Sequence, residues 1–377
     1  MTDYSQTAPA RLSTRLAFFA AGFAMACLAP LFPFIKSQVG ANEGQFGLIL
    51  LCLGLGSIIA MPVTGIISAR YGAKPMILLG GFGLVLFLPA LVFAPSPIVL
   101  GAILFLFGAS LGTIDVAMNV HGAEIEGLEQ RFLMSNFHAQ FSIGGFFGAG
   151  LVTLLLSFGT QFHTAAIIGA VLTLFAMILA RSGLLSVSGK EPEPFKFPRG
   201  VVLLLALLAG ITFLVEGAVL DWGAILIIDQ ELAAKENAGI GYILFSVAMV
   251  IARLSGDKII NVLGGFKVLV LGGIVTIAGI AIILLSPSAL LAKSGFILIG
   301  LGAANLVPII FSAAGRQKIM PSSLAVASVT TTGYAGILLG PALIGFAANI
   351  SSLSMAFWLL AILMAVIPLT AKIVARI

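Results

Sequence analysis

Long apolar runs, separated by short polar breaks, follow one another along the whole chain. Runs of about 20 residues or more are long enough for a helix to cross a hydrocarbon core about 30 Å thick. The runs are continuous, whereas a membrane barrel would need short strands with alternating polar and apolar positions. The pattern therefore predicts an all-α membrane protein of about twelve transmembrane helices. Breaks at charges, Pro and Gly clusters place these helices near 12–36, 44–69, 75–93, 98–122, 133–158, 163–181, 200–229, 239–256, 267–285, 291–315, 322–348 and 353–372.

The second half of this pattern repeats the first. A shift of 192 residues without a gap superimposes glycines and a Pro-Ser pair at equivalent places in the two halves. The matched positions are Gly72 and Gly264, Gly80-Gly81 and Gly272-Gly273, Pro95-Ser96 and Pro287-Ser288, Gly108 and Gly300, Gly144 and Gly336, and Gly148 and Gly340. The repeat predicts two pseudo-symmetric six-helix bundles, 1–181 and 200–377, joined by a polar cytoplasmic linker at 182–199. Parallel repeats of this kind are typical of transporters whose substrate site lies near mid-membrane.

Composition and charge place the repeat in a membrane with a defined orientation. The 377 residues are 60% hydrophobic and 9% charged, whereas soluble domains carry about a quarter charged residues. A cytoplasmic N-terminus leaves Lys36, Lys235 and Lys293 as the outer basic residues and puts the other 16 of 19 inside. We expect a multi-pass protein of the bacterial inner membrane with both termini in the cytoplasm. The net charge of +5 then reflects topology, so we expect the lipid bilayer and no nucleic acid as a partner.

The polar break after the second span carries a recognisable motif. It reads Gly65-Ile66-Ile67-Ser68-Ala69-Arg70-Tyr71-Gly72-Ala73-Lys74. This resembles the loop of the major facilitator superfamily, in which Gly, three residues and Asp precede a basic residue, any residue, Gly and two basic residues. Four positions match, namely Gly65, Arg70, Gly72 and Lys74, while Ala69 replaces the Asp and Ala73 replaces a basic residue.

The resemblance implies twelve helices, transport and a gating role for this loop. In the corresponding break of the second half, Arg253 and Asp257 lie four residues apart, on one face of a helix. The alternative for these two residues is a solvated helix end.

Two further segments narrow the resemblance within the superfamily. Asp115-Val-Ala-Met-Asn119, Arg131 and His138-Ala-Gln-Phe-Ser142-Ile-Gly144 resemble the fucose permease-like branch. Glu216-Gly-Ala-Val-Leu-Asp221-Trp222 is most similar to the bacterial YbjJ-type proteins of that branch. These segments imply transport but do not name a substrate.

Glu216 is the strongest candidate for chemistry, because it lies near the middle of the seventh span. An isolated carboxylate is costly to keep ionised there, so it should face protein or water and should bind and release a proton. Such a residue can couple solute movement to a proton gradient. In the alternative interpretation, Glu216 only hydrogen-bonds a neighbouring helix.

Further polar residues lie at comparable depth in other spans. Asp115 and Asn119 are one turn apart in the fourth span, and His138 should lie at a similar level in the fifth. Together they can form a proton relay, grip a polar ligand or clamp two helices. Asn305 precedes Pro308 in the tenth span, where we expect an irregular helix lining a cavity or packing closely.

Two features near span ends are more ambiguous. Asp221 lies toward the outer end of the seventh span, as part of an outer gate with Lys36 or Lys293 or as a residue at headgroup level. His121 and Glu124 have a spacing that can hold a metal, but we interpret them as a solvated cytoplasmic helix end. We expect no metal site.

The chain carries no phosphate-binding loop, zinc-protease motif or nucleophile elbow, so it is predicted not to be an enzyme and to need no cofactor. Energy must then come from an ion gradient or from the substrate's own gradient. The preferred hypothesis is proton-coupled symport of a small polar or sugar-like solute by a monomer, with alternating access. One alternative is efflux of amphipathic compounds by proton antiport. Another is a membrane sensor or scaffold that transports nothing.

Overall fold

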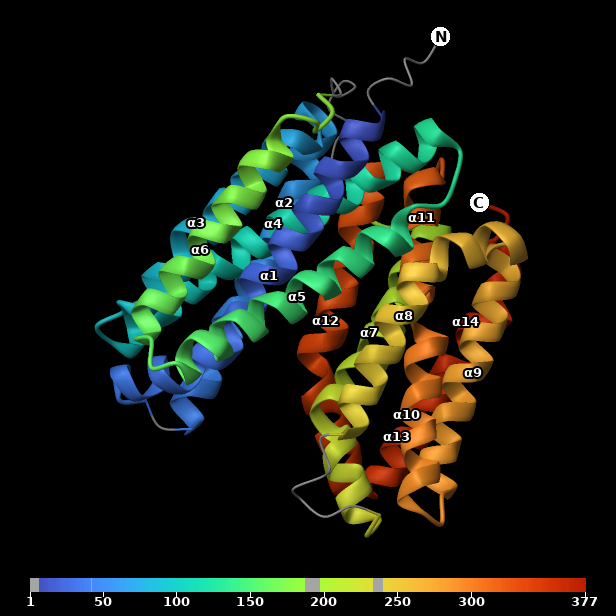
Figure 1. Ribbon diagram of the computed structural model, residues 1–377. Coiled ribbons are helices and arrows are strands. Elements are labelled where there is room, and N and C mark those ends of the chain that lie inside the picture. Colours follow the sequence, from blue (N-terminus) through green and yellow to red (C-terminus); the bar gives the residue numbers. More distant parts are fainter. Residues whose placement is uncertain (1–6, 42, 187–196, 233–239) are drawn as a thin grey trace. The chain divides into compact units, whose positions relative to one another are not determined.

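The computed structural model describes residues 7–41, 43–186, 197–232 and 240–377, and helices are the only regular secondary structure among them (Figure 1). In chain order they are α1 (Thr7–Val39), α2 (Glu43–Tyr71), α3 (Ala73–Val92), α4 (Pro97–Glu129), α5 (Met134–Ser157), α6 (Phe162–Arg181), α7 (Val201–Asp229), α8 (Ile240–Leu263), α9 (Gly265–Leu285), α10 (Ala289–Ala303), α11 (Leu306–Arg316), α12 (Ser322–Ile350), α13 (Leu353–Met364) and α14 (Val366–Val374).

Eleven segments of the described chain are long and apolar enough to cross a membrane. Two of these segments contain a break: α10 and α11 form one candidate span, and α13 and α14 form another. The helix α8 is not among the eleven, and it carries Arg253, Asp257 and Lys258 in its second half. With α8 the described residues contain twelve helical stretches, which confirms the predicted all-α membrane fold.

The chain divides into two compact units. Unit 1 comprises Met1–Gln130, Phe137–Phe197 and Met320–Thr331, and unit 2 comprises Arg131–Asn136, Pro198–Ile319 and Thr332–Ile377. Within unit 1, α4 packs against α1, α2 and α3, and α6 packs against α1 and α3. Within unit 2, α10 packs against α8 and α9, and α7 packs against α11 and α13. Most of the expected linker lies outside the described residues, at 187–196.

The 192-residue repeat is visible in the way that equivalent helices begin. Gly72 and Gly264 precede α3 and α9 with φ angles of 80° and 79°, a conformation that favours glycine. Ser96 and Ser288 precede α4 and α10, and each hydroxyl accepts a hydrogen bond from the backbone N–H three residues later. Such caps satisfy N–H groups that the first helical turn leaves unpaired.

Close helix contacts also recur at the repeat distance. A side chain at Gly108 of α4 would overlap the backbone oxygen of Leu53 in α2. At the equivalent place in unit 2, a side chain at Gly300 of α10 would overlap the backbone oxygen of Phe245 in α8. Glycine lets two helix backbones approach closely, which membrane helices use in place of a hydrophobic driving force. Equivalent helices in the two units therefore pack through equivalent glycines.

The tenth span is interrupted where the sequence suggested an irregular helix. The helix α10 ends at Ala303, and α11 begins at Leu306 after a turn at Ala304 and Asn305. Pro308 lies in the first turn of α11 and has no backbone N–H to continue the helical hydrogen bonds. This break lies beside the charged part of α8.

Candidate functional site

Glu216 of α7 and Arg253 of α8 form an ion pair inside unit 2. One guanidinium nitrogen of Arg253, Nη2, lies 3.4 Å from Oε1 of Glu216. The side chain of Glu216 is 16% exposed and that of Arg253 is 8% exposed, so both charges are largely removed from solvent. The structure thus joins the expected proton-binding residue to one that the sequence suggested only as a gating residue. The alternative of a solvated helix end is wrong for Arg253, because its side chain is buried.

A backbone carbonyl holds the other end of the same guanidinium. Nε of Arg253 donates to the carbonyl oxygen of Ala304 at 3.1 Å. In an uninterrupted helix this oxygen would accept from the backbone N–H of residue 308, but that residue is Pro308. The break after α10 therefore presents a carbonyl to Arg253.

Asn305 occupies the neighbouring position in the break and also contacts α8. Its Nδ2 donates to the carbonyl oxygen of Ala252 at 3.2 Å, and its Oδ1 accepts from the hydroxyl of Ser135 at 2.8 Å. A side chain at Gly256 would overlap Oδ1 of Asn305. The buried amide therefore fits only because α8 carries glycine at this position.

Asp257 lies one turn beyond Arg253 on α8. Its Oδ2 accepts a hydrogen bond from the backbone N–H of Asn136 at 3.2 Å, within unit 2. The predicted gating pair therefore has two different sets of contacts: Arg253 binds Glu216 and Ala304, and Asp257 binds the first turn of α5.

Asp115, Asn119 and His138 meet inside unit 1, at the level that their sequence positions suggested. Nδ2 of Asn119 donates to the carbonyl oxygen and to Oδ1 of Asp115, at 2.9 and 3.1 Å. Oδ1 of Asn119 lies 3.1 Å from Nε2 of His138. Because an amide oxygen only accepts, Nε2 carries the hydrogen and His138 donates. Phe18 packs against the imidazole, with ring centroids 5.3 Å apart.

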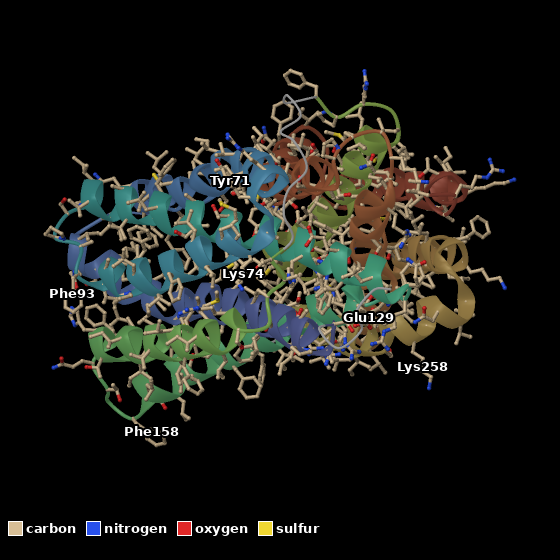
Figure 2. The ribbon with its side chains drawn as sticks, turned by 90° about the horizontal axis from the view of Figure 1, so that it is seen from above. Tyr71, Lys74, Phe93, Glu129, Phe158 and Lys258 are labelled. Atoms are coloured by element: carbon tan, nitrogen blue, oxygen red, sulfur yellow. The ribbon has the colours of Figure 1, made fainter. Side chains whose placement is uncertain are left out.

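The remaining predicted gating residues lie around the turn between α2 and α3, where Figure 2 labels Tyr71 and Lys74. Arg70 lies over the ring of Tyr71 at 5.0 Å. A side chain at Gly65 would overlap the methyl group of Ala327, which belongs to the same unit. The structure thus gives Gly65 a close helix contact and Gly72 its positive φ angle. Asp221, five residues beyond Glu216 on α7, is exposed.

His121 is buried, so the expected solvated helix end is wrong at this residue. Its Nε2 accepts a hydrogen bond from the backbone N–H of Leu185 at 2.9 Å. Its Nδ1 lies 2.8 Å from the hydroxyl of Thr14, which donates to the carbonyl oxygen of Ala10 at 2.8 Å. Both ring nitrogens are therefore used in hydrogen bonds within the protein. Among the described residues no group of three His, Cys, Asp or Glu side chains is arranged to hold a metal.

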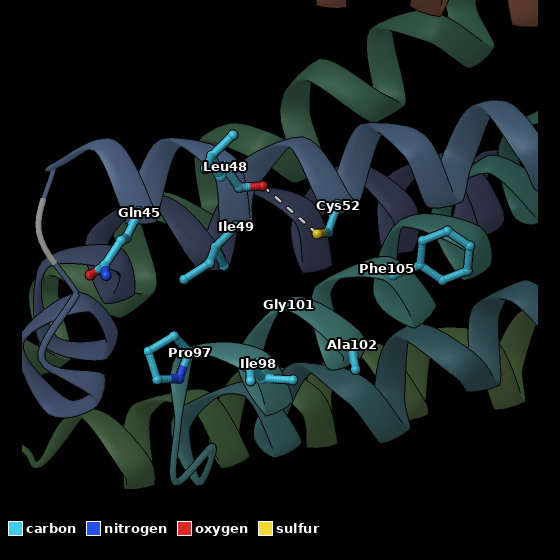
Figure 3. Close-up of a pocket in the computed structure, with 9 residues that line it drawn as sticks. All are labelled: Gln45, Leu48, Ile49, Cys52, Pro97, Ile98, Gly101, Ala102 and Phe105. Atoms are coloured by element: carbon cyan, nitrogen blue, oxygen red, sulfur yellow. Dashed lines mark hydrogen bonds between the residues drawn. The ribbon is translucent and has the colours of Figure 1, made fainter.

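A hollow of about 450 Å³ lies between α2 and α4 in unit 1, and it contains none of the predicted site residues (Figure 3). Its lining is mostly apolar, with Leu48 and Ile49 on one side and Ile98 and Phe105 on the other. Gln45 is the polar side chain at one end. Sequence reasoning missed this hollow, because apolar residues of two helices carry no signal until the helices are packed.

Comparison with known proteins agrees with this architecture. The model of the Major Facilitator Superfamily matches residues 15–318. An uncharacterized MFS-type transporter of Yersinia pestis is 46% identical over 368 residues, which are 97% of this chain and 96% of the relative.

Two solved structures share the fold at low sequence identity. The Escherichia coli fucose:proton symporter FucP superimposes with a TM-score of 0.78 at 17% identity, over 99% of this chain and all of that one. The human organic anion transporter MFSD10 gives 0.79 at 14% identity, over 97% and 99% of the two chains. The match of the family model and the close bacterial relative together show that the chain belongs to the Major Facilitator Superfamily, a family of membrane transporters and not of enzymes.

Proposed function

We propose that the protein is a proton-coupled symporter of a small polar solute, and that Glu216 is the residue that takes up and releases the proton. The observation that carries the proposal is the pair formed by Glu216 and Arg253, buried in the middle of α7 and the second half of α8. Ionisable side chains are costly to keep inside a membrane-spanning bundle, so such a pair is expected to have a function.

The ion pair links the protonation state of Glu216 to the contact between α7 and α8. While Glu216 is ionised, its charge and that of Arg253 offset each other in a poorly solvated place. Protonation of Glu216 removes one of the two charges and weakens its contact with the guanidinium. Contacts of α7 with α8 therefore depend on the proton, as coupling between a proton site and a conformational change requires.

Asp115, Asn119 and His138 form the second part of the proposed site. Their hydrogen bonds join a carboxylate, an amide and an imidazole within unit 1. Such groups can bind hydroxyl groups of a sugar-like solute or pass a proton along the chain of hydrogen bonds. The name of FucP supports proton coupling by analogy, while that of MFSD10 shows that the same fold also serves organic anions.

The membrane placement belongs to the same proposal. Basic residues gather on one side of the predicted spans, so we propose that both termini lie in the cytoplasm and that the membrane is the bacterial inner membrane.

Proteoliposomes containing the purified full chain test the role of Glu216. The solute is first identified by a thermal-shift screen of sugars, organic acids, amino acids and drugs. We expect Glu216→Gln to retain solute exchange at equal concentrations but to accumulate no solute above equilibrium when a proton gradient is applied. Asp229→Asn, at the exposed end of the same helix, is the matched control and should accumulate like the parent protein. Undiminished accumulation by Glu216→Gln would reject the role.

Efflux of amphipathic compounds is the second candidate, and the apolar hollow between α2 and α4 is the observation that favours it. This function predicts that overproduction of the protein increases resistance of cells to amphipathic drugs. It also predicts that a large side chain at Gly101, in the wall of the hollow, removes this resistance. A transporter of polar solutes would leave drug resistance unchanged in both experiments.

A further inference from the structure

At the break between α10 and α11, the backbone carbonyl of Ala304 lacks the N–H donor that it would have in a continuous helix. Pro308 stands where a helix would donate an N–H to the oxygen of Ala304, and proline has none. Ala304 is fully buried, so an unpaired carbonyl there would be costly. The side chain of Arg253 fills the position of the missing donor at 3.1 Å.

This contact also determines the direction of the guanidinium group. The group is planar and rigid, so fixing Nε at the carbonyl of Ala304 limits where the two terminal nitrogens can lie. One of them, Nη2, lies 3.4 Å from Glu216. The guanidinium of Arg253 is thus bound at Nε by the carbonyl of Ala304 and at Nη2 by the carboxylate of Glu216.

The adjacent residues of both helices are joined in the same way. Asn305, next to Ala304, donates to the carbonyl of Ala252, next to Arg253. Two consecutive residues of the break therefore bind two consecutive residues of α8. The arrangement fixes α8 against the break at the point where α8 meets Glu216.

We propose that Pro308 is a positioning residue for proton coupling, because the N–H that it lacks leaves the carbonyl of Ala304 free to hold Arg253 toward Glu216. The inference rests on the proposed coupling role of Glu216. An N–H at residue 308 would compete for the same oxygen and would let the guanidinium turn away. The effect should therefore come from one hydrogen atom and not from the shape of the proline ring.

Two replacements at residue 308 separate the N–H from the ring. Pro308→Ala introduces an N–H and removes the ring. Pro308→lactic acid, made by nonsense suppression, has the same methyl side chain but an ester oxygen in place of the N–H. We expect the alanine variant to lose about tenfold in the rate of proton-driven accumulation, since the bond it disturbs is made by a charged group. The pH dependence of uptake should shift in the same variant. The ester variant should keep the parent rate and pH dependence.

Equal behaviour of the alanine and ester variants would overturn the inference, because the N–H would then be irrelevant. A second comparison excludes a general packing defect. In the Glu216→Gln background, Pro308→Ala should leave solute exchange unchanged, and a tenfold loss there would also overturn the inference. Arg253→Lys gives independent evidence if the alanine variant does not fold. Lysine keeps the charge but has no planar fork, so accumulation should fall, and parental accumulation would count against the proposal.

These outcomes are distinct from failure of the proposed function. If Glu216→Gln still accumulates solute, the coupling role of Glu216 is wrong whatever Pro308 does. If Glu216→Gln loses accumulation while Pro308→Ala keeps it, the coupling role stands and only the positioning role of Pro308 is wrong.

Discussion

Hydrogen-bond partners determine which ring nitrogen carries the hydrogen in two histidines of unit 1, His121 and His138. His121 accepts an N–H at Nε2, so its hydrogen is on Nδ1 and points to Thr14. His138 donates from Nε2 to Asn119. The same side chain is therefore in two different hydrogen-bonding states in one unit.

Nitrogen-15 NMR of histidine-labelled protein tests this assignment. In a His163→Gln variant two histidines remain. We expect His121 to carry its hydrogen at Nδ1 and not at Nε2, and His138 to carry a hydrogen at Nε2. Replacing Thr14 with valine should change only the signals of His121. If both rings carry the hydrogen at Nε2, the hydrogen bond from Leu185 to His121 is wrong.

At the residue scale, the sequence predicts which side chains are unusual but not which partners they have. Glu216 is conspicuous because it interrupts an apolar run. Its pairing with Arg253 depends on how α7 packs against α8, and the two residues are 37 positions apart. The prediction of a solvated helix end is wrong at His121 for the same reason. Its neighbours in sequence include several glutamates, which suggest a solvated helix end, while its partners lie on α1 and beyond α6.

At the scale of helices, glycines set the distance between neighbouring elements. Gly108 lets α4 approach α2, and Gly300 lets α10 approach α8 at the equivalent place. These contacts involve backbone atoms, which cannot move aside as the end of a long side chain can. We expect such positions to be among the least tolerant in the chain.

Alanine at either glycine should destabilise the protein by about 1–3 kcal/mol, because the added methyl group overlaps a backbone oxygen. Thermal or denaturant unfolding of the purified protein in detergent measures the effect. Gly150→Ala is the matched control, since no atom beyond the local backbone of α5 lies within 4 Å of the added carbon, and it should be neutral or slightly stabilising. Melting of Gly108→Ala and Gly300→Ala at the temperature of Gly150→Ala would contradict the close approach.

Most helices are predictable because the membrane requires long apolar runs, and their length alone reveals them. Their breaks are only partly predictable. Pro308 indicated an irregular tenth span, but the hydrogen bond that replaces the lost one comes from α8 and has no local signal. The helix α8 is not among the eleven candidate spans. Its second half carries charged residues, and one of them, Arg253, forms an ion pair inside unit 2.

At the scale of the whole molecule, the two units have equivalent helix starts and contacts but different polar residues. Unit 1 has the Asp115–Asn119–His138 chain, and unit 2 has the Glu216–Arg253 pair. The family resemblance in the sequence is confirmed by the match of the family model and by the shared fold. Glycine positions and apolar runs report packing, so the roles of these two groups in transport are tested by measurements of solute and proton movement.

Proton movement during solute uptake tests the central claim most directly. Lightly buffered proteoliposomes without an imposed gradient are given the solute, and the external pH is followed. The parent protein and Asp229→Asn should make the external medium more alkaline as solute enters, whereas Glu216→Gln should exchange solute without changing the pH. Alkalinisation by Glu216→Gln at the parental rate would contradict the assignment of the proton to Glu216.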